Sequence, residues 1–322
     1  MADKKPKRSG AHSAGAHSKS AGGAASGGAH SSKAPKQLTA GAHSAGTALV
    51  KKPKAAKEPK EPKQKKPLPK GLITRIVLII CIVAAVAGIG GLAYYGWGYI
   101  SARQTYSNIE KQADVTITMD VAEGTDEIPH ITIDWDALRK VSPNIVGWIY
   151  IPDTKVSYPI VQASDNDYYL YRDANGKSSR SGAIYMDCDS KRDFSDLHSI
   201  IYGHSMQDGS MFRCLLKYPE GDFWDQHPYI YLVTPDNVTH RLLIFSAYTE
   251  RSSGEMRRTY FDNDNRLKDY IARAQQKSCR DIGVDVSGAK HLYSFITCDY
   301  QYTAARMLVQ AVEVDAQGNV IK

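Results

Sequence analysis

The chain has 322 residues and a formal net charge of +7, and 42% of its residues are hydrophobic. This length could hold two average domains. No residue spacing resembles a zinc, iron–sulfur or calcium-binding loop, and no glycine-rich turn opens a helix as a phosphate cradle does. The sequence therefore argues against these classes of site and predicts neither a metal nor a cofactor.

The first 70 residues form a distinct basic segment. They include almost no large apolar side chains, and Gly-Ala-His-Ser recurs at Gly10, Gly15, Gly28 and Gly41. Such a segment buries too little apolar surface to offset its chain entropy, so we expect a disordered tail over residues 1–71. The 70 residues hold 16 Lys and Arg against 3 Asp and Glu, a net of +13. Since the whole chain carries +7, the rest of it carries −6.

The tail has more than one possible role. Its Lys/Pro run, Lys51–Lys70, could hold anionic lipid headgroups or nucleic acid. The position of this run before an apolar stretch favours a solvated tail that only sets membrane topology, and we expect no nucleic-acid partner. The regularly embedded histidines leave a weak metal site as a minor alternative.

The next segment is long and apolar. No residue from Ile76 to Ala102 is charged, and an aromatic belt closes the run with Tyr94, Tyr95, Trp97 and Tyr99. About 20 apolar residues span a bilayer as a helix. The alternative is a cleaved signal peptide, whose apolar core would be shorter and nearer the start. We therefore predict a single transmembrane helix over residues 72–100 in the cell membrane, with the tail cytoplasmic and the rest extracellular.

Beyond the span we expect an extracellular stalk or linker over residues 101–133 and a folded domain over residues 134–322. Ser101–Ala113 is typical of a helix and Asp114–His130 of an irregular connector, and two further helices are expected at Met211–Tyr218 and Arg266–Lys277. Short apolar runs between turn signals predict a mostly β domain, an eight-stranded barrel with peripheral helices. The expected strands are Ile145–Ile151, Val156–Val161, Ala183–Met186, Ser199–Tyr202, Tyr229–Val233, Arg241–Tyr248, His291–Thr297 and Met307–Val314.

Three residue types at strand ends indicate thiol chemistry. Cys298 closes one apolar run and Arg306 opens the next, which places a thiol and a guanidinium at neighbouring strand ends. His204 follows another apolar strand. A thiol becomes a useful nucleophile at neutral pH only beside a basic or positive group, which His204 and Arg306 could supply. On its own, a cysteine that ends a strand is more often a small buried hydrophobic residue.

Several motifs resemble one family of enzymes. Ser294-Phe-Ile-Thr-Cys298 resembles the cysteine signature of the sortases, membrane-anchored cysteine transpeptidases of Gram-positive bacteria, and Tyr202-Gly-His-Ser-Met206 resembles their histidine motif. The segments Asn144–Ile149, Gly182–Asp187 and Asp208–Phe212 are similar to class B sortases in particular. The match covers roughly residues 134–314 in family order and includes the helix that class B members insert between the sixth and seventh strands.

The resemblance implies a transpeptidase with Cys298 as nucleophile, His204 as acid and base, and Arg306 as oxyanion or substrate donor. The implied substrate is a surface protein or pilin whose sorting pentapeptide is cut after Thr, which leaves a thioester on the cysteine. An amine of peptidoglycan or of a pilin lysine resolves that thioester. The sorting motif, the acceptor amine and the choice between wall anchoring and pilus assembly are not fixed by the motifs.

Residues around the cysteine are weaker candidates for substrate binding: Ser294, Ile296, Thr297 and Asp299. Ser294 and Phe295 stand where the family usually has Thr and Leu. Ile296 stands where some class B members have Ser, so a hydroxyl contact from that position is lost. Asp299 could orient His204 or cap a turn, and the turn is favoured because aspartate commonly serves turns.

Two other function classes stay open at the level of sequence. One is a thiol peptidase that resolves the same acyl-enzyme with water, although the order of histidine before cysteine excludes a papain-like layout. The other is a catalytically inactive barrel that binds peptide or wall polymer. Mostly free thiols are expected, because a bridge through Cys298 would abolish activity and leave an odd set at Cys188, Cys214 and Cys279.

Overall fold

A computed structural model describes residues 69–120, 128–252, 255, 257–298 and 304–322. The predicted tail lies almost wholly outside these residues, and so does Asp299. Both predictions therefore stay untested.

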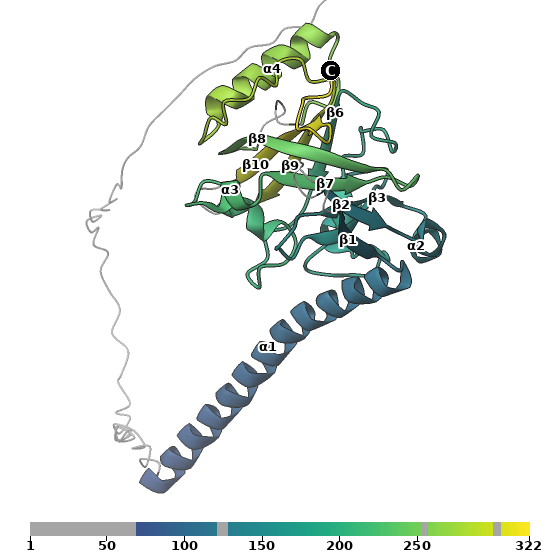
Figure 1. Cartoon of the computed structure of the whole chain (residues 1–322). Coiled ribbons are helices and arrows are strands. Elements are labelled where there is room, and N and C mark those ends of the chain that lie inside the picture. Colours follow the sequence, from purple (N-terminus) through teal and green to yellow (C-terminus); the bar gives the residue numbers. More distant parts are fainter. Residues whose placement is uncertain (1–68, 121–127, 253–254, 256, 299–303) are drawn as a thin grey trace, which may run out of the picture. The chain divides into compact units, whose positions relative to one another are not determined.

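The first element is one continuous helix, α1 (Lys70–Gln112), of 43 residues. By length and composition it is a helix able to cross a membrane. Its C-terminal end lies beside α2 (Trp135–Val141) and turns two residues, Tyr106 and Ile109, into the core of the barrel domain (Figure 1). The predicted transmembrane span and the predicted helical stalk are thus parts of one continuous helix. The C-terminal end of this helix packs against the barrel domain instead of separating from it.

The segment expected to be an irregular connector is a two-stranded sheet. β1 (Thr116–Asp120) pairs antiparallel with β2 (Ile128–Thr132), and Ile131 is fully buried. The residues of both strands alternate in polarity, which is the pattern of a half-buried strand. Each run has only five residues, which explains why the sequence favours a linker here. α2 then begins where Asp134 accepts a hydrogen bond from the Ala137 amide at 2.9 Å, a side-chain cap.

The main sheet closes into a barrel in the order β10-β8-β7-β3-β4-β5-β6-β9, so the predicted eight-stranded barrel is confirmed. All pairs are antiparallel except β4 with β5 and β6 with β9. The strands are β3 (Ile145–Tyr150), β4 (Ser157–Val161), β5 (Ile184–Met186), β6 (His198–Tyr202), β7 (Tyr229–Val233), β8 (Thr239–Arg251), β9 (Leu292–Cys298) and β10 (Ala305–Val314). 

Helices lie in the connections. The helix expected over Met211–Tyr218 is the 3₁₀ helix η2 (Phe212–Lys217), and the inserted helix is α4 (Asp264–Lys277), which Asn263 caps. Two shorter ones are η1 (Tyr168–Tyr171) and α3 (Phe223–Gln226). α4 packs its apolar face against β8 on the outside of the barrel (Figure 1).

Two apolar clusters result, because successive side chains of a strand point to opposite faces. Phe295 of β9 belongs to the interior cluster, whereas Ile296 belongs to the outer cluster with Leu267 and Ile271 of α4. This alternation decides which β9 side chains share a face with Cys298.

The docking of α1 is testable by a pair of identical substitutions on that helix. Ile109 is 2% exposed and Ile100 is 61% exposed. We expect Ile109→Ala to lower the free energy of unfolding of the barrel domain by about 2–5 kcal/mol, because it leaves a cavity in the core. Ile100→Ala should leave it unchanged. Urea unfolding of the full chain in detergent micelles, followed by tryptophan fluorescence, measures both; equal midpoints would mean that the helix does not contribute to the core.

Candidate active site

The three predicted catalytic residues lie at one end of three adjacent strands. β9 pairs antiparallel with β10, and Cys298 stands directly opposite Arg306 in that register. On its other side β9 runs parallel to β6, with Tyr202 level with Ile296 and the Gly203 amide bonded to the Ile296 carbonyl at 3.1 Å. His204 therefore follows at the level of Cys298, so the sheet brings residues more than 90 positions apart together.

A cleft of about 500 Å³ joins these side chains. Its wall includes Cys298, His204 and Arg306, the end of β9, and two outer segments from the loops after β4 and β8. The residues that those loops contribute are Ser164, Asp165, Asn166, Asp167, Leu170, Ser252 and Arg257. Cys298 is partly exposed, so a substrate can reach its sulfur.

A main-chain carbonyl orients His204. Its Nε2 lies 2.7 Å from the Leu170 carbonyl oxygen. A carbonyl only accepts, so Nε2 carries the hydrogen and Nδ1 is the nitrogen that exchanges a proton in the neutral ring. The ring of Tyr171 lies 5.8 Å from the imidazole ring and limits its rotation on another side. The histidine is thus fixed in one tautomer by a neutral main-chain acceptor.

Gly182 packs against this arrangement. A Cβ built there would lie 2.6 Å from the Leu170 oxygen and 3.0 Å from His204 Cδ2, and the residue has a φ of +58°. Both the left-handed backbone and the lack of space require glycine. Any side chain at this position would displace the acceptor of the histidine.

Arg306 brings a permanent positive charge to the strand end opposite the thiol. Its Nη1 donates to the Ala305 carbonyl at 2.9 Å, which engages one nitrogen of the planar guanidinium. A guanidinium has five N–H donors, so others can reach a substrate oxygen.

The other thiols outside the apolar span of α1 are poor nucleophile candidates. Burial raises the pKa of Cys214 to about 12. Burial first, and then Asp187 and Asp189, raise the pKa of Cys188, and burial raises the pKa of Cys279. Because the thiolate is the reactive form, these shifts disfavour attack by those residues. All five cysteines lie in the described part of the chain and are free, as expected.

A polar network behind the cleft was missed by the sequence analysis. The Tyr202 hydroxyl donates to the buried Asp187 carboxylate at 2.7 Å, and Asn166 Nδ2 donates to the same oxygen at 3.1 Å. Burial and then Asp187 raise the pKa of Tyr202 well above its usual range, which keeps the phenol a donor. Arg257 Nη2 lies 3.9 Å from that oxygen. The only sequence signal was the presence of Tyr202 and Asp187 in family-like segments.

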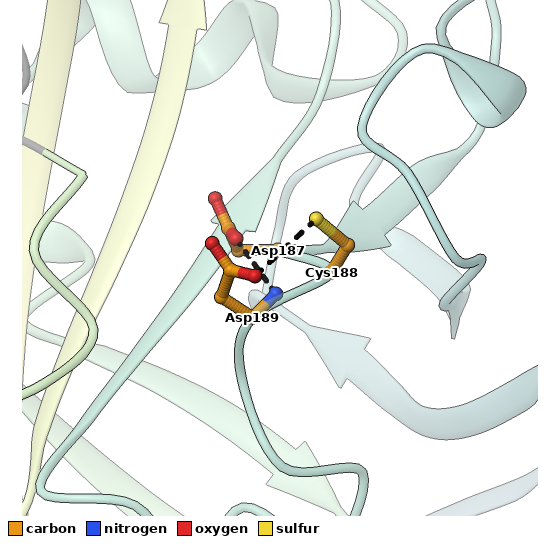
Figure 2. Close-up of side chains that lie close together, drawn as sticks. All are labelled: Asp187, Cys188 and Asp189. Carbon is orange, nitrogen blue, oxygen red and sulfur yellow. Dashed lines mark hydrogen bonds between the residues drawn. The ribbon is translucent and has the colours of Figure 1, made fainter.

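Asp187, Cys188 and Asp189 form a small cluster whose potential ligand atoms lie within 4.8 Å of one another (Figure 2). The Asp189 amide donates to Asp187 Oδ1 at 3.0 Å, and Oδ2 already accepts from Tyr202 and Asn166. Both carboxylate oxygens of Asp187 thus have protein partners. The cluster is explained as a turn that anchors the network, and nothing further points to a metal ligand set.

The three secondary candidates within the described residues have different positions. Ile296 faces outward with Cys298 and lines the cleft. Thr297 borders the cleft, but its side chain is on the opposite, interior face, where its buried Oγ1 has no hydrogen-bond partner among the described residues. Ser294 is fully buried and outside the lining of the cleft. The expectation that Ser294 binds substrate stays a prediction, and among the described residues its hydroxyl bonds to Gln310 and His198.

Ser294 is one link in a buried chain of hydrogen bonds. Gln310 Nε2 donates to Ser294 Oγ at 2.9 Å, and Ser294 Oγ lies 2.8 Å from His198 Nε2. His198 Nδ1 lies 2.6 Å from the Arg258 carbonyl and must donate to it, so Nε2 accepts from the serine. This series of hydrogen bonds connects β6, β9 and β10 to the segment around Arg258, which also carries Arg257 to the cleft. These contacts give His198 a structural role in the domain.

Comparison with known proteins finds similar chains of one kind. Over 175 residues the chain is 35% identical to sortase B of Listeria monocytogenes. The aligned residues make up 54% of this chain and 71% of the relative. It resembles the crystal structure of sortase B from Bacillus anthracis with a TM-score of 0.58 and 30% identity, over 68% of this chain and 99% of that one. For a Staphylococcus aureus sortase B–substrate complex the TM-score is 0.52 and the identity 28%, over 56% and 86% of the two chains. No protein-family model matches.

The buried His198 predicts an acid-sensitive step in stability. Burial lowers the pKa of His198 to about 4, against an ordinary value of 6.5. Between these two values the unfolded chain binds more protons than the folded one, so stability falls as the pH is lowered from 6.5 to 4, by on the order of 3 kcal/mol from this residue. His198→Gln should be less stable at pH 7 and lose less stability over that interval. Urea unfolding at each pH measures the difference, and parallel curves would contradict the assignment.

Proposed function

The chain belongs to the class B sortases, which are cysteine transpeptidases, and we propose that Cys298, His204 and Arg306 perform the transfer. The observation that supports these roles is the meeting of the three side chains in one cleft at adjacent strand ends. Membership of the family gives the type of reaction, and the geometry of the cleft supports our assignment of the residues.

The first half of the reaction forms the acyl-enzyme. The Cys298 thiolate attacks the carbonyl carbon of the substrate threonine, and the carbonyl electrons move onto oxygen. As the tetrahedral intermediate collapses, the peptide C–N bond breaks and a thioester remains on Cys298. Nδ1 of His204 holds the proton that Cys298 lost when it became a thiolate, and it donates this proton to the leaving amine while Nε2–H stays engaged with the Leu170 carbonyl.

The second half reverses these roles. An incoming amine attacks the thioester carbonyl, His204 Nδ1 accepts its proton, and the C–S bond breaks to release the thiolate. The product is a new amide bond. No net oxidation or hydrolysis occurs, so the cycle needs neither a cofactor nor water.

Arg306 stabilises the charge that develops on the substrate oxygen. It lies opposite Cys298 across the β9–β10 pair, on the strand end that borders the cleft. A planar guanidinium can donate two parallel hydrogen bonds to a carbonyl region, which a lysine ammonium cannot reproduce.

The substrates we propose are surface proteins or pilins with a sorting pentapeptide cut after threonine. The acceptor is an amine of peptidoglycan or of a pilin lysine. Support comes from the open cleft beside Cys298 and from a similar S. aureus sortase B that was solved as a substrate complex. Cell-wall anchoring or pilus assembly is the process in which this transfer takes part.

The location we propose follows from charge and hydropathy. The apolar part of α1 crosses the cell membrane, the Lys-rich segment before it is cytoplasmic, and the barrel is extracellular. In intact protoplasts, added protease should remove the Cys298 domain and spare the Lys-rich tail, as detected by antibodies to each part. Lysed protoplasts, in which both parts are digested, are the control. Protection of the domain in intact protoplasts would reverse the orientation.

Substitution of the three residues tests their roles. The assay uses the full chain in detergent micelles and a quenched fluorescent peptide with a Pro-x-Thr core. Cys298→Ala should abolish both cleavage and transfer, since no other group forms the acyl intermediate, and His204→Ala should do nearly the same. Arg306→Lys should lose roughly 10²–10³ in turnover, the cost of one oxyanion donor.

Matched controls come from residues outside the cleft. Cys279→Ala and Arg280→Lys make the same chemical changes at a second exposed thiol and guanidinium and should leave turnover unchanged. Near-normal turnover of Arg306→Lys would replace the oxyanion role by a purely electrostatic one. If an added amine yields only hydrolysed peptide, the protein acts as a thiol peptidase under those conditions.

A further inference from the structure

Helix α1 reaches the back of the candidate active site through one side chain. The Tyr106 hydroxyl donates to the Gly182 carbonyl at 2.8 Å in a buried contact. Its ring packs edge-on against Tyr158 with centroids 5.1 Å apart, which fixes the direction of the hydroxyl. Burial raises the pKa of Tyr106 well above its usual range, so the phenol stays a donor at all working pH values.

Gly182 also packs against the groups that orient the histidine. A Cβ built on it would lie 2.6 Å from the Leu170 oxygen, 2.8 Å from the Tyr169 oxygen and 3.0 Å from His204 Cδ2, so there is no room for a methyl group between them. The Leu170 oxygen is the acceptor of His204 Nε2–H. The peptide that carries the Gly182 carbonyl also donates its Ala183 amide to the Tyr169 carbonyl at 3.1 Å, which couples its position to the segment that holds this acceptor.

We propose that Tyr106 is a positioning residue for His204, which acts by fixing the Gly182 peptide against the carbonyl that orients the imidazole. This inference rests on the proposed acid and base role of His204. Tyr106 touches no reacting atom. Because it belongs to the same helix as the apolar span, that helix supports the active site as well as carrying the candidate anchor.

A purely stabilising role is the alternative, since any buried phenol that loses its hydroxyl leaves a carbonyl unpaired. Tyr218 provides the matched comparison. It is equally buried, and its hydroxyl donates to the His227 carbonyl at 3.0 Å, away from the cleft lining. Tyr106→Phe and Tyr218→Phe thus remove the same bond type from the same kind of environment.

The experiment compares the two variants with the parent and with His204→Ala, as full chains in detergent micelles. We expect Tyr106→Phe to lower kcat roughly tenfold with little change in KM for the peptide, since a displacement of about 1 Å can cost up to about 10²-fold. The limb of the pH profile that reports His204 should move to lower pH, because a loosened Leu170 acceptor stabilises the imidazolium less. Tyr218→Phe should match it in thermal destabilisation and leave kcat and the pH profile at parent values.

Two results would overturn the inference. If Tyr106→Phe keeps the parent kcat and pH limb while His204→Ala is inactive, Tyr106 is structural only and the proposed reaction stands. If Tyr218→Phe loses kcat and shifts the limb as much as Tyr106→Phe, general destabilisation explains both. Substantial turnover of His204→Ala would instead reject the proposed reaction itself, so the two failures are distinguishable.

Discussion

The active-site geometry depends on the two different pairings of strand β9. Its antiparallel ladder with β10 sets Cys298 opposite Arg306, and its parallel ladder with β6 sets the residues after Tyr202 level with the same cysteine. Each ladder is built from backbone hydrogen bonds, so it fixes the main-chain positions from which the thiol, guanidinium and imidazole project. A shift of either register by one residue would send the cysteine to the other face of the sheet.

The histidine is fixed by main-chain groups in the same way. The preceding residue, Gly203, donates its amide to the Ile296 carbonyl, and the His204 carbonyl accepts from the Phe212 amide at 2.9 Å. Its ring donates to a third main-chain group, the Leu170 carbonyl. A neutral acceptor selects the tautomer but adds no negative charge to the cleft, where a carboxylate at that place would oppose formation of the thiolate.

The sequence was most informative where strand ends carry chemistry. The apolar runs around Cys298 and Arg306 predicted adjacent strands, and their pairing is as expected because so few residues separate the two runs in the sequence. Ser294 shows that a sequence motif does not predict the contacts of each of its side chains. It shares a strand with Cys298, but only the fold reveals that His198 and the Arg258 segment cover it. The family signature marked the position without separating substrate contact from support of the core.

Other features needed tertiary structure. Tyr106 and Ile109 follow a long apolar run, so their burial on one face of α1 was hidden by the hydropathy of the span. The Asp187–Tyr202 pair joins two separate strand ends, and no local pattern connects them. The β1–β2 pair alternates over only five residues a strand, too few to stand out from a polar linker.

The continuity of α1 also bears on how far the cleft can lie from a membrane. A helix advances about 1.5 Å with each residue. In the location we propose, the apolar part of α1 crosses the bilayer and Tyr106 joins the same helix to the barrel, so the helix acts as a rigid spacer. Each residue inserted just before Tyr106 would lengthen that spacer by about 1.5 Å. The length of the helix is therefore a means by which evolution or design can set the distance between this cleft and the membrane surface.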